Sequence, residues 1–169
     1  MQRRQFLISI FAAALPTTII FDSALGKAQE NSFPLGKTRE EWLALLGDTS
    51  FSVLFEEATE RAFSSPLNGE ARDGTFICKA CKTPLFSSST KYESGTGWPS
   101  FTDPLVGSVK TKVDRTLWMI RTEYHCTRCG GHQGHVFDDG PKPSGRRWCN
   151  NGAALQFVPQ GTPMPAVGE

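Results

Sequence analysis

The sequence predicts a compact, mainly antiparallel β domain with two short helices on its N-terminal side. Two observations predict this fold class. After Gly74 the chain consists of short apolar runs separated by Gly, Pro and Ser, which is the pattern of short strands and turns. Four cysteines form two CxxC pairs, a spacing typical of a zinc site that clips short strands together.

Residues 37–47 are expected to form the first helix, because Thr38 and Glu41 match a capping box and Gly47 is a stop signal. The apolar stripe expected to face the body of the domain is Trp42, Leu45 and Leu46. A second helix is expected over residues 50–57, with Phe51, Leu54 and Phe55 turned inward.

The strands follow the helices. Short runs with β-like composition occur at 75–78, 84–86, 109–113, 117–124, 135–137, 146–149 and 154–158. Several short strands with a single metal clip favour one antiparallel β domain, with the helices covering one end of it.

The two CxxC pairs are Cys78 with Cys81 and Cys126 with Cys129. Each spacing lets both sulfurs of a turn face one ion, so the four thiolates suit one structural Zn²⁺ that contributes on the order of 10 kcal/mol to folding. Two disulfides, as in a thiol oxidoreductase, are the alternative. Neither pair precedes a thioredoxin-like helix pattern, so zinc is preferred.

The fifth cysteine, Cys149, has no partner and follows Arg147 by two residues. On a strand, residues two apart share a face, so Arg147, Cys149 and Asn151 are expected to point the same way. A thiol between a permanent cation and a carboxamide is a candidate nucleophile. The alternative is an inert, buried cysteine.

Two further segments are interpreted as loops. Residues 93–101 place two glycines before Trp98, which presents an indole as an apolar wall or as part of a packed turn. Residues 130–135 follow the second zinc pair and carry His132 and His135. Because zinc would anchor one end of this segment, the two imidazoles are candidate site residues. The alternative is that they are ordinary surface or core histidines.

The N-terminus is interpreted as a signal peptide over residues 1–28. Arg3 and Arg4 precede an apolar stretch that is shorter than a bilayer-spanning helix and is interrupted by polar residues and a proline. This pattern indicates a twin-arginine export signal. The alternative is an uncleaved membrane anchor. Residues 29–169 then form a single exported, periplasmic domain. Twin-arginine export carries folded cargo, so the thiolates would cross already capped by zinc.

Charge excludes one class of partner. The whole chain carries a formal net charge of +1. Removing residues 1–28 takes away Arg3, Arg4, Lys27 and Asp22, which leaves −1. A near-neutral charge balance without a basic cluster argues against nucleic acid as the partner. A monomer is expected.

Several motifs together resemble a known family. In order along the chain they are Thr59-Glu60-Arg61, Cys78-x-x-Cys81, Ser94-Gly95-Thr96-Gly97-Trp98-Pro99-Ser100-Phe101, Arg121-Thr122-Glu123, Cys126-x-x-Cys129, His132-Gln133-Gly134-His135-Val136-Phe137 and Arg147-Trp148-Cys149-Asn150-Asn151. This order is similar to that of B-type peptide methionine sulfoxide reductases, which reduce the R epimer of methionine sulfoxide in oxidative-stress repair. The resemblance covers roughly residues 37–158.

The resemblance implies two antiparallel sheets with N-terminal helices and one structural zinc. It implies Cys149 as the nucleophile that becomes a sulfenic acid, with His132, His135 and Asn151 beside the substrate sulfoxide. Trp98 would form part of the pocket for the methyl group. The implied partners are oxidised proteins or peptides as substrate and a thioredoxin-like or other thiol as reductant. A secreted, zinc-stabilised peptide-binding module without catalysis is the alternative.

Three positions depart from the family pattern. Thr96 stands where many members have a resolving cysteine, so an external thiol is expected to reduce the sulfenic acid directly. For an exported protein that thiol belongs to a periplasmic or membrane-linked relay. Gln133 and Asn150 replace aliphatic residues.

Arg147 is expected to assist the chemistry by lowering the pKa of Cys149. A drop of roughly two pH units would raise the thiolate fraction about 25-fold and cost about eightfold in nucleophilicity, a net gain of about threefold. Proton delivery by a histidine, typically worth about 10²–10⁴, is therefore expected to matter more.

Overall fold

The computed structural model describes residues 33–115 and 120–167, which belong to one compact unit, Asn31–Glu169. The predicted signal peptide, residues 1–28, lies outside the described residues, as do residues 117–119 of one predicted strand. Within the described ranges, no helix has the length and apolar character needed to cross a membrane.

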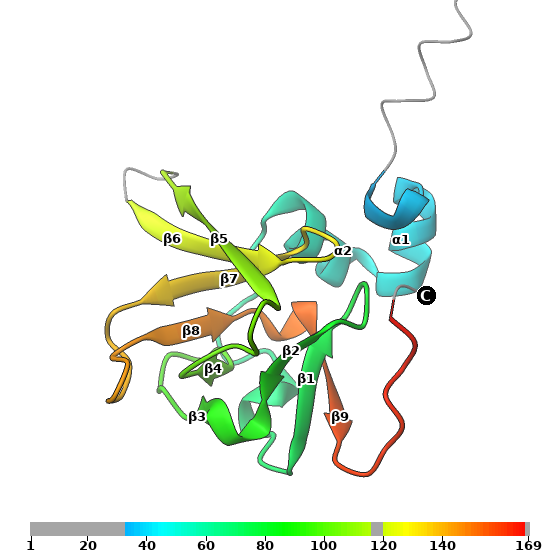
Figure 1. Ribbon diagram of the computed structural model, residues 1–169. Helices are drawn as coiled ribbons and strands as arrows, with labels where there is room; N and C mark the ends of the chain where they lie inside the picture. Colours follow the sequence, from blue (N-terminus) through cyan, green and yellow to red (C-terminus); the bar gives the residue numbers. More distant parts are fainter. Residues whose placement is uncertain (1–32, 116–119, 168–169) are drawn as a thin grey trace, which may run out of the picture. The chain divides into compact units, whose positions relative to one another are not determined.

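The described chain contains two α-helices, several single 3₁₀ turns and nine strands (Figure 1). The helices are α1 (Arg39–Leu46) and α2 (Asp48–Glu56), and the 3₁₀ turns are Pro34–Gly36, Pro66–Gly69, Ser88–Thr90 and Gly152–Ala154. The strands are β1 (Gly74–Cys78), β2 (Pro84–Ser87), β3 (Lys91–Tyr92), β4 (Ser100–Phe101), β5 (Val109–Asp114), β6 (Arg121–Cys126), β7 (His132–Phe137), β8 (Arg147–Asn150) and β9 (Leu155–Pro159).

Helix α1 begins with the predicted capping box. The Thr38 hydroxyl accepts a hydrogen bond from the Glu41 backbone N–H, and the Glu41 carboxylate accepts one from the Thr38 N–H. The predicted apolar stripe is only partly right. Trp42 is buried and Leu46 packs partly buried against the core, but Leu45 is 62% exposed, which shows that α1 buries only a narrow face.

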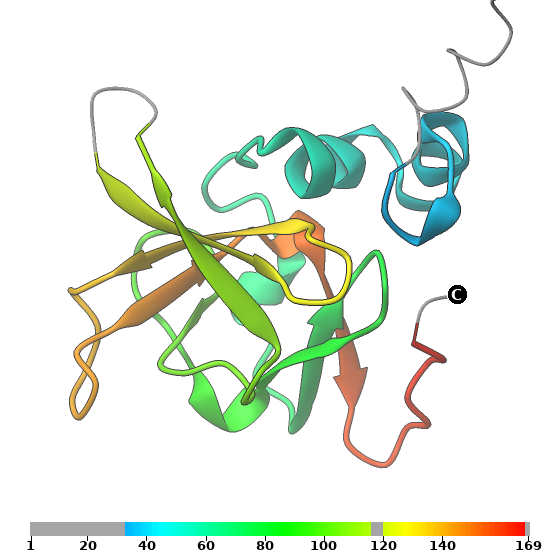
Figure 2. The same cartoon turned by 45° about the horizontal axis from the view of Figure 1, so that its top comes forward.

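Helix α2 buries Phe51 and Leu54, as predicted, and lies against β7 and the Gly152–Ala154 turn. In both Figure 1 and Figure 2 the two helices lie together at one end of the sheets, close to the C-terminal segment. The helices thus cover one end of the β structure.

The strands form two antiparallel sheets, as the family resemblance implied. The smaller has the order β2-β1-β9, and the larger has the order β3-β4-β8-β7-β6-β5. The short strands β3 and β4 were not predicted, because two residues carry no periodicity. The mainly β fold class is confirmed.

An aromatic core joins the sheets. Phe76 of the small sheet contacts Phe101 of the large sheet with ring centroids 5.0 Å apart, and Phe86 stacks on Phe101 at 4.1 Å. Tyr124 and Trp148 continue this core along the large sheet, with centroids 5.0 Å apart. Because these rings occupy one face of β6 and β8, their sequence neighbours must face the other way.

Candidate active site

Strand β8 alternates as its sequence predicts. Trp148 and Asn150 are buried on the core side, and Arg147 and Cys149 share the opposite face. Cys149 is partly accessible, and it is not bonded to any other cysteine. The position of Cys149 therefore follows from the burial of its two neighbours.

Strand β7 carries both histidines, which corrects the prediction of a loop at residues 130–135. His132 pairs with His125 and Gly134 pairs with Tyr124, so Gln133 is an extra, bulged residue. In a regular strand, residues three apart point to opposite faces. The bulge brings His132 and His135 to the same face, with ring centroids 5.5 Å apart.

Gly134 allows β7 and β8 to approach closely at the thiol. A Cβ atom on Gly134 would lie 1.9 Å from the Cys149 carbonyl oxygen, so a larger residue does not fit. His135 is the direct cross-strand partner of Cys149. Side chains at such positions have Cβ atoms about 4.5–5.5 Å apart, which places the imidazole beside the thiol.

Gln133 connects this strand to its surroundings. Its carbonyl oxygen accepts hydrogen bonds from the Asn151 backbone N–H at 2.8 Å and from Asn151 Nδ2 at 3.1 Å. Its side-chain amide donates to Cys78 Sγ at 3.6 Å and to the Gly131 carbonyl at 3.4 Å. The bulged residue thus holds Asn151 on one side and the cysteine cluster on the other.

A pocket of about 140 Å³ opens over Cys149. The residues that line it are Thr59, Trp98, Arg121, Gly134, His135, Phe137, Cys149, Asn150 and Asn151. Of the residues predicted for the site, the structure therefore brings Cys149, His135, Asn151 and Trp98 together around one cavity. His132 and Arg147 lie on the same face of the sheet but do not line this pocket.

Glu60 holds two residues of the pocket lining, Asn151 and Trp98, and no role was predicted for it. Its carboxylate accepts hydrogen bonds from the backbone N–H groups of Gly152 and Ala153, and its own N–H donates to Asn151 Oδ1 at 3.1 Å. Its carbonyl accepts from Trp98 Nε1 at 3.1 Å. The indole and the carboxamide of the pocket are thus held by one residue far away in the sequence.

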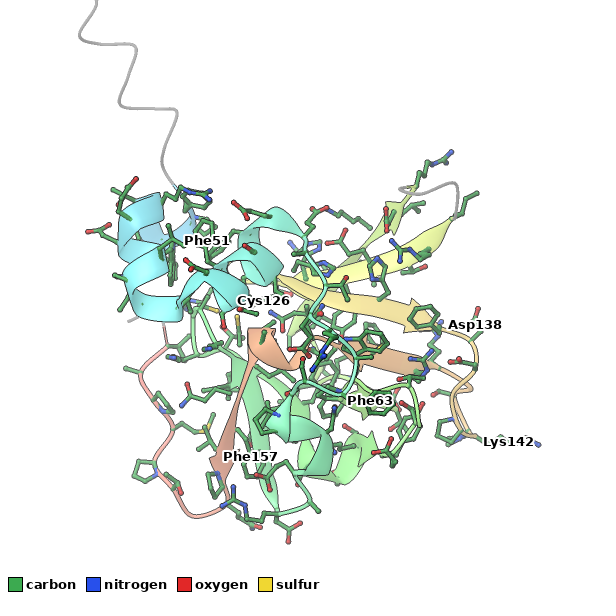
Figure 3. All side chains as sticks on the ribbon, turned by 180° about the vertical axis from the view of Figure 1, so that it is seen from behind. Phe51, Phe63, Cys126, Asp138, Lys142 and Phe157 are labelled. Atoms are coloured by element: carbon green, nitrogen blue, oxygen red, sulfur yellow. The ribbon has the colours of Figure 1, made fainter. Side chains whose placement is uncertain are left out.

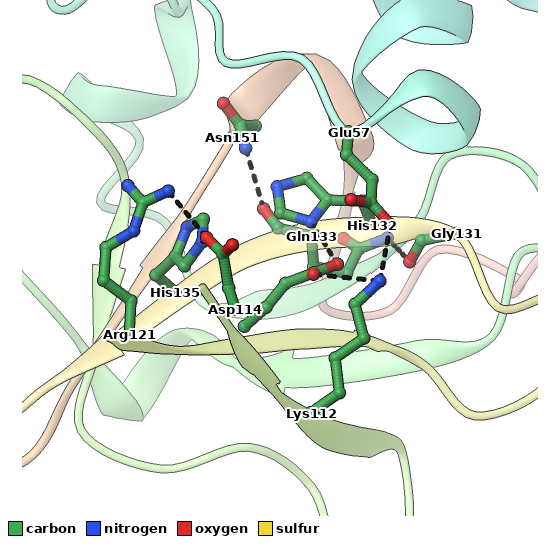
Figure 4. Close-up of polar contacts among 10 residues, drawn as sticks. Glu57, Lys112, Asp114, Arg121, Gly131, His132, Gln133, His135 and Asn151 are labelled. Atoms are coloured by element: carbon green, nitrogen blue, oxygen red, sulfur yellow. Dashed lines mark hydrogen bonds and ion pairs between the residues drawn. The ribbon is translucent and has the colours of Figure 1, made fainter. Parts of the chain in front are cut away.

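Carboxylates hold both histidines, as Figure 4 shows. His132 Nδ1 lies 2.7 Å from Glu123 Oε1, and Glu123 also pairs with Lys112 at 3.0 Å. His135 Nε2 lies 2.9 Å from Asp114 Oδ2, and Asp114 pairs with Arg121 at 2.6 Å. The sequence signal for these partners is the alternation of charged residues along β5 and β6, which places their charged side chains on one face of each strand.

The environment of His135 favours its neutral form. Burial lowers its pKa below the ordinary value, against the opposing effect of the hydrogen bond that His135 donates to Asp114, while Arg121 and His132 add repulsion. Because a carboxylate only accepts hydrogen bonds, His135 Nε2 carries the hydrogen and Nδ1 keeps a lone pair. The imidazole is therefore able to take up a proton at Nδ1.

The electrostatics of Cys149 correct the predicted effect of Arg147. Burial raises the pKa of the Cys149 thiol more than Arg147 and the Thr96 hydroxyl lower it, and Asp139 raises it further. The Arg147 guanidinium is paired with a carboxylate. It donates hydrogen bonds to both Asp139 oxygens, at 2.8 and 2.9 Å, and lies 4.4 Å from the Phe137 ring centroid. The resting pair is thus thiol and imidazole.

This raised pKa predicts slow alkylation of Cys149 by iodoacetamide at pH 7. The rate is expected to rise about tenfold per pH unit and to level off only above about pH 8.5, the value for an unperturbed thiol. Arg147→Gln is expected to move the midpoint further upward, because the lowering influence is lost. The Cys149→Ser protein supplies the background rate from the other cysteines. A midpoint below about 8.5 would contradict this assignment.

The other four cysteines form a cluster that is able to hold a zinc ion. Cys78, Cys81, Cys126 and Cys129 are buried, and their sulfurs all lie within 4.8 Å of one another. The Cys78–Cys129 and Cys81–Cys126 sulfur pairs are 3.7 and 3.5 Å apart. Tetrahedral Zn–S bonds of about 2.3 Å place sulfurs about 3.8 Å apart, whereas a disulfide needs about 2.05 Å.

Two equivalent turns present these sulfurs. The residue after each CxxC pair, Lys82 or Gly130, has a φ of 60° or 69° and donates its N–H to the carbonyl of the first cysteine, Cys78 or Cys126, at 2.9 Å. Both turns therefore have the same closed geometry, and the four sulfurs converge on one point. The chemistry and spacing of the donor set fit zinc, and with four protein ligands the site would be closed.

These features define a β protein with a four-cysteine cluster and a separate, partly accessible thiol at a small pocket, and comparison with known proteins shows which family it belongs to. A family model described as the SelR domain matches residues 46–159. The chain is 47% identical over 125 residues to the peptide methionine sulfoxide reductase MsrB of Pseudomonas fluorescens (strain Pf0-1), covering 73% of this chain and 95% of that protein.

Two further relatives carry the same name. The protein from Leptospira interrogans serovar Lai is 46% identical over 127 residues, covering 75% of this chain and 97% of the relative. The protein from Methanosarcina barkeri (strain Fusaro) is 48% identical over 122 residues, covering 72% of this chain and 86% of the relative. The chain therefore belongs to the SelR family, that of the B-type peptide methionine sulfoxide reductases.

Proposed function

We propose that this protein reduces the R epimer of methionine sulfoxide in oxidised polypeptides to methionine, acting as a monomer. The observation that carries the proposal is the pairing of Cys149 with His135 across adjacent strands, in a pocket that Trp98 also lines. Family membership supports the reaction class, since the relatives are named peptide methionine sulfoxide reductases.

The reaction needs a nucleophile for the sulfoxide sulfur and a proton for its oxygen, because oxide does not leave. His135 Nδ1 takes the Cys149 thiol proton, the sulfur attacks, and the imidazolium delivers the proton to the oxygen. Overall, the sulfoxide S–O bond breaks and an S–O bond to Cys149 forms. Cys149 loses two electrons and becomes a sulfenic acid, and the methionine sulfur gains them. The thiol proton ends on the sulfenic oxygen.

The pocket supports selection of one epimer. A sulfoxide sulfur is pyramidal and carries a methyl group, an oxygen and the methionine side chain. If the methyl group lies against Trp98, the oxygen lies towards His135 and Asn151, and the side chain leaves by the mouth, only one mirror image presents its sulfur to Cys149. Assignment of that image to the R epimer rests on the family resemblance.

Zinc would be held by Cys78, Cys81, Cys126 and Cys129. When bound, it supplies a closed cross-link between strands and takes no part in the reaction. Gln133 reaches this cluster with its amide and the site with its backbone. The cross-link would therefore also position the strand that carries His132 and His135.

Recycling requires an external reductant. Thr96 contacts Cys149 where many family members have a resolving cysteine, and the chain has only five cysteines, of which four form the cluster. A thiol from a thioredoxin-like partner would attack the sulfenic acid and release water, and a second thiol would resolve the mixed disulfide. We further propose that residues 1–28 direct export, so that the partner is periplasmic.

The proposal is tested by turnover of separated R and S epimers of a methionine sulfoxide peptide, with dithiothreitol as the reductant and methionine quantified by chromatography. The R epimer is expected to be consumed and the S epimer left at the protein-free background. Consumption of neither epimer by the zinc-loaded protein would refute the reductase assignment, and equal consumption of both would refute the stereochemistry.

A further inference from the structure

Phe63 is an exposed aromatic residue next to the pocket, and it has no role in the proposed reaction. Its side chain is 72% exposed, and its φ of 64° is in the left-handed region, which non-glycine residues adopt only at a cost in free energy. It belongs to the segment between α2 and the Pro66–Gly69 turn (Figure 3). Neither burial nor backbone preference explains an aromatic residue at this position.

The surroundings of Phe63 hold it in place. Its N–H donates to the Gly97 carbonyl at 2.7 Å, and its ring lies so close to Gly97 that a Cβ atom there would be 2.8 Å from the ring. Gly97 directly precedes Trp98, which lines the pocket and donates to the Glu60 carbonyl. The ring is therefore displayed on the outer side of the turn that forms the pocket wall.

The size of the pocket determines what lies next to this ring. A cavity of about 140 Å³ takes little more than the end of one side chain. The polypeptide that carries an oxidised methionine must therefore run over the rim, rising about 3.3 Å per residue if extended. A strained and exposed aromatic residue at the rim is typical of a recognition surface.

We propose that Phe63 is a specificity-determining contact, a platform for an apolar side chain within a few residues of the oxidised methionine in an unfolded polypeptide. This rests on the proposed function and extends it to the substrate class. Oxidised segments exposed by unfolding present apolar neighbours, whereas free methionine sulfoxide has none. The protein would thus prefer peptides with apolar flanking residues over polar peptides and the free amino acid.

The test is the single-turnover rate of the pre-reduced protein with three R sulfoxides: a leucine-flanked peptide, a serine-flanked peptide and free methionine sulfoxide. Single turnover excludes the reductant from the measurement. Phe63→Asn is the main variant, because asparagine tolerates positive φ and preserves the backbone. Phe63→Tyr keeps the ring. Leu45→Gln, at a residue of α1 that is 62% exposed and outside the pocket lining, is the matched control.

Phe63→Asn is expected to lose about tenfold with the leucine-flanked peptide, the effect of burying one mid-sized apolar contact, and less than twofold with the other two substrates. Phe63→Tyr and Leu45→Gln are expected to match the wild type. An equal loss on all three substrates would overturn the proposal in favour of a structural role. A loss seen only in steady-state recycling with thioredoxin would overturn it in favour of reductant docking. Wild-type inactivity on every R sulfoxide would instead refute the proposed function.

Discussion

His135→Gln is expected to slow single-turnover reduction of the R sulfoxide by about 10²–10⁴-fold, the usual value of a positioned proton donor. The glutamine Nε2 replaces the donor that faces Asp114, so the ion pair with Arg121 and the strand pairing are preserved, while the titrating nitrogen is lost. The measurement is rapid-quench formation of methionine, with Cys149→Ser as the variant without a nucleophile and therefore without product.

Two matched variants make this result specific. His132→Asn keeps a donor to Glu123 and removes an imidazole that does not line the pocket. The single-turnover rate is therefore expected to fall less than in His135→Gln. Arg147→Lys is expected to change the rate by about threefold or less, since charge near a thiol alters thiolate fraction and nucleophilicity in opposite directions. A loss in either variant as large as that of His135→Gln would contradict the assignment of His135 as the donor.

Removing the metal from the four-cysteine cluster is expected to abolish the cooperative fold. A structural tetrathiolate zinc contributes on the order of 10 kcal/mol or more, which is comparable with the whole stability of a domain, about 5–15 kcal/mol. Because Cys78 receives a hydrogen bond from Gln133, the bulge that positions both histidines is lost with it. Thermal unfolding by circular dichroism, before and after chelation, with zinc measured by elemental analysis, checks this expectation.

Cys149→Ser is the control for this second prediction. It is expected to retain one zinc per chain and the melting temperature of the wild type, because Cys149 is not part of the cluster. Cys129→Ser is expected to behave like the chelated protein. A metal-free protein that still unfolds cooperatively at the wild-type temperature would show that the cluster does not stabilise the fold.

Local signals account for the parts of the fold that were predicted. The capping box at Thr38 and Glu41 marked the start of α1, and period-two burial placed Trp148 on the core side of β8. The two-residue spacing within each cysteine pair marked the two turns that present the sulfurs, at Cys78–Cys81 and at Cys126–Cys129. Each signal lies within a few residues of the feature it predicts, because capping, alternation and turn geometry are short-range effects.

Other features depended on pairing between distant segments. The segment with His132 and His135 was interpreted as a loop, because its glycines obscure the strand pattern, and only its register with β6 shows the bulge at Gln133. The inward prediction for Leu45 was wrong, because nothing in the sequence shows how wide a face α1 buries. The carboxylates that hold the histidines come from strands β5 and β6.

The sequence by itself determined the kinds of groups that this protein brings to its site: one unpaired thiol, two imidazoles, an indole, a carboxamide and four metal-binding sulfurs. The tertiary structure decided which of them meet and in which protonation state. Burial, not the adjacent arginine, sets the direction of the pKa of Cys149, and strand register selects His135 as its neighbour. Desolvation and register arise only when the chain has folded, so no local pattern encodes them.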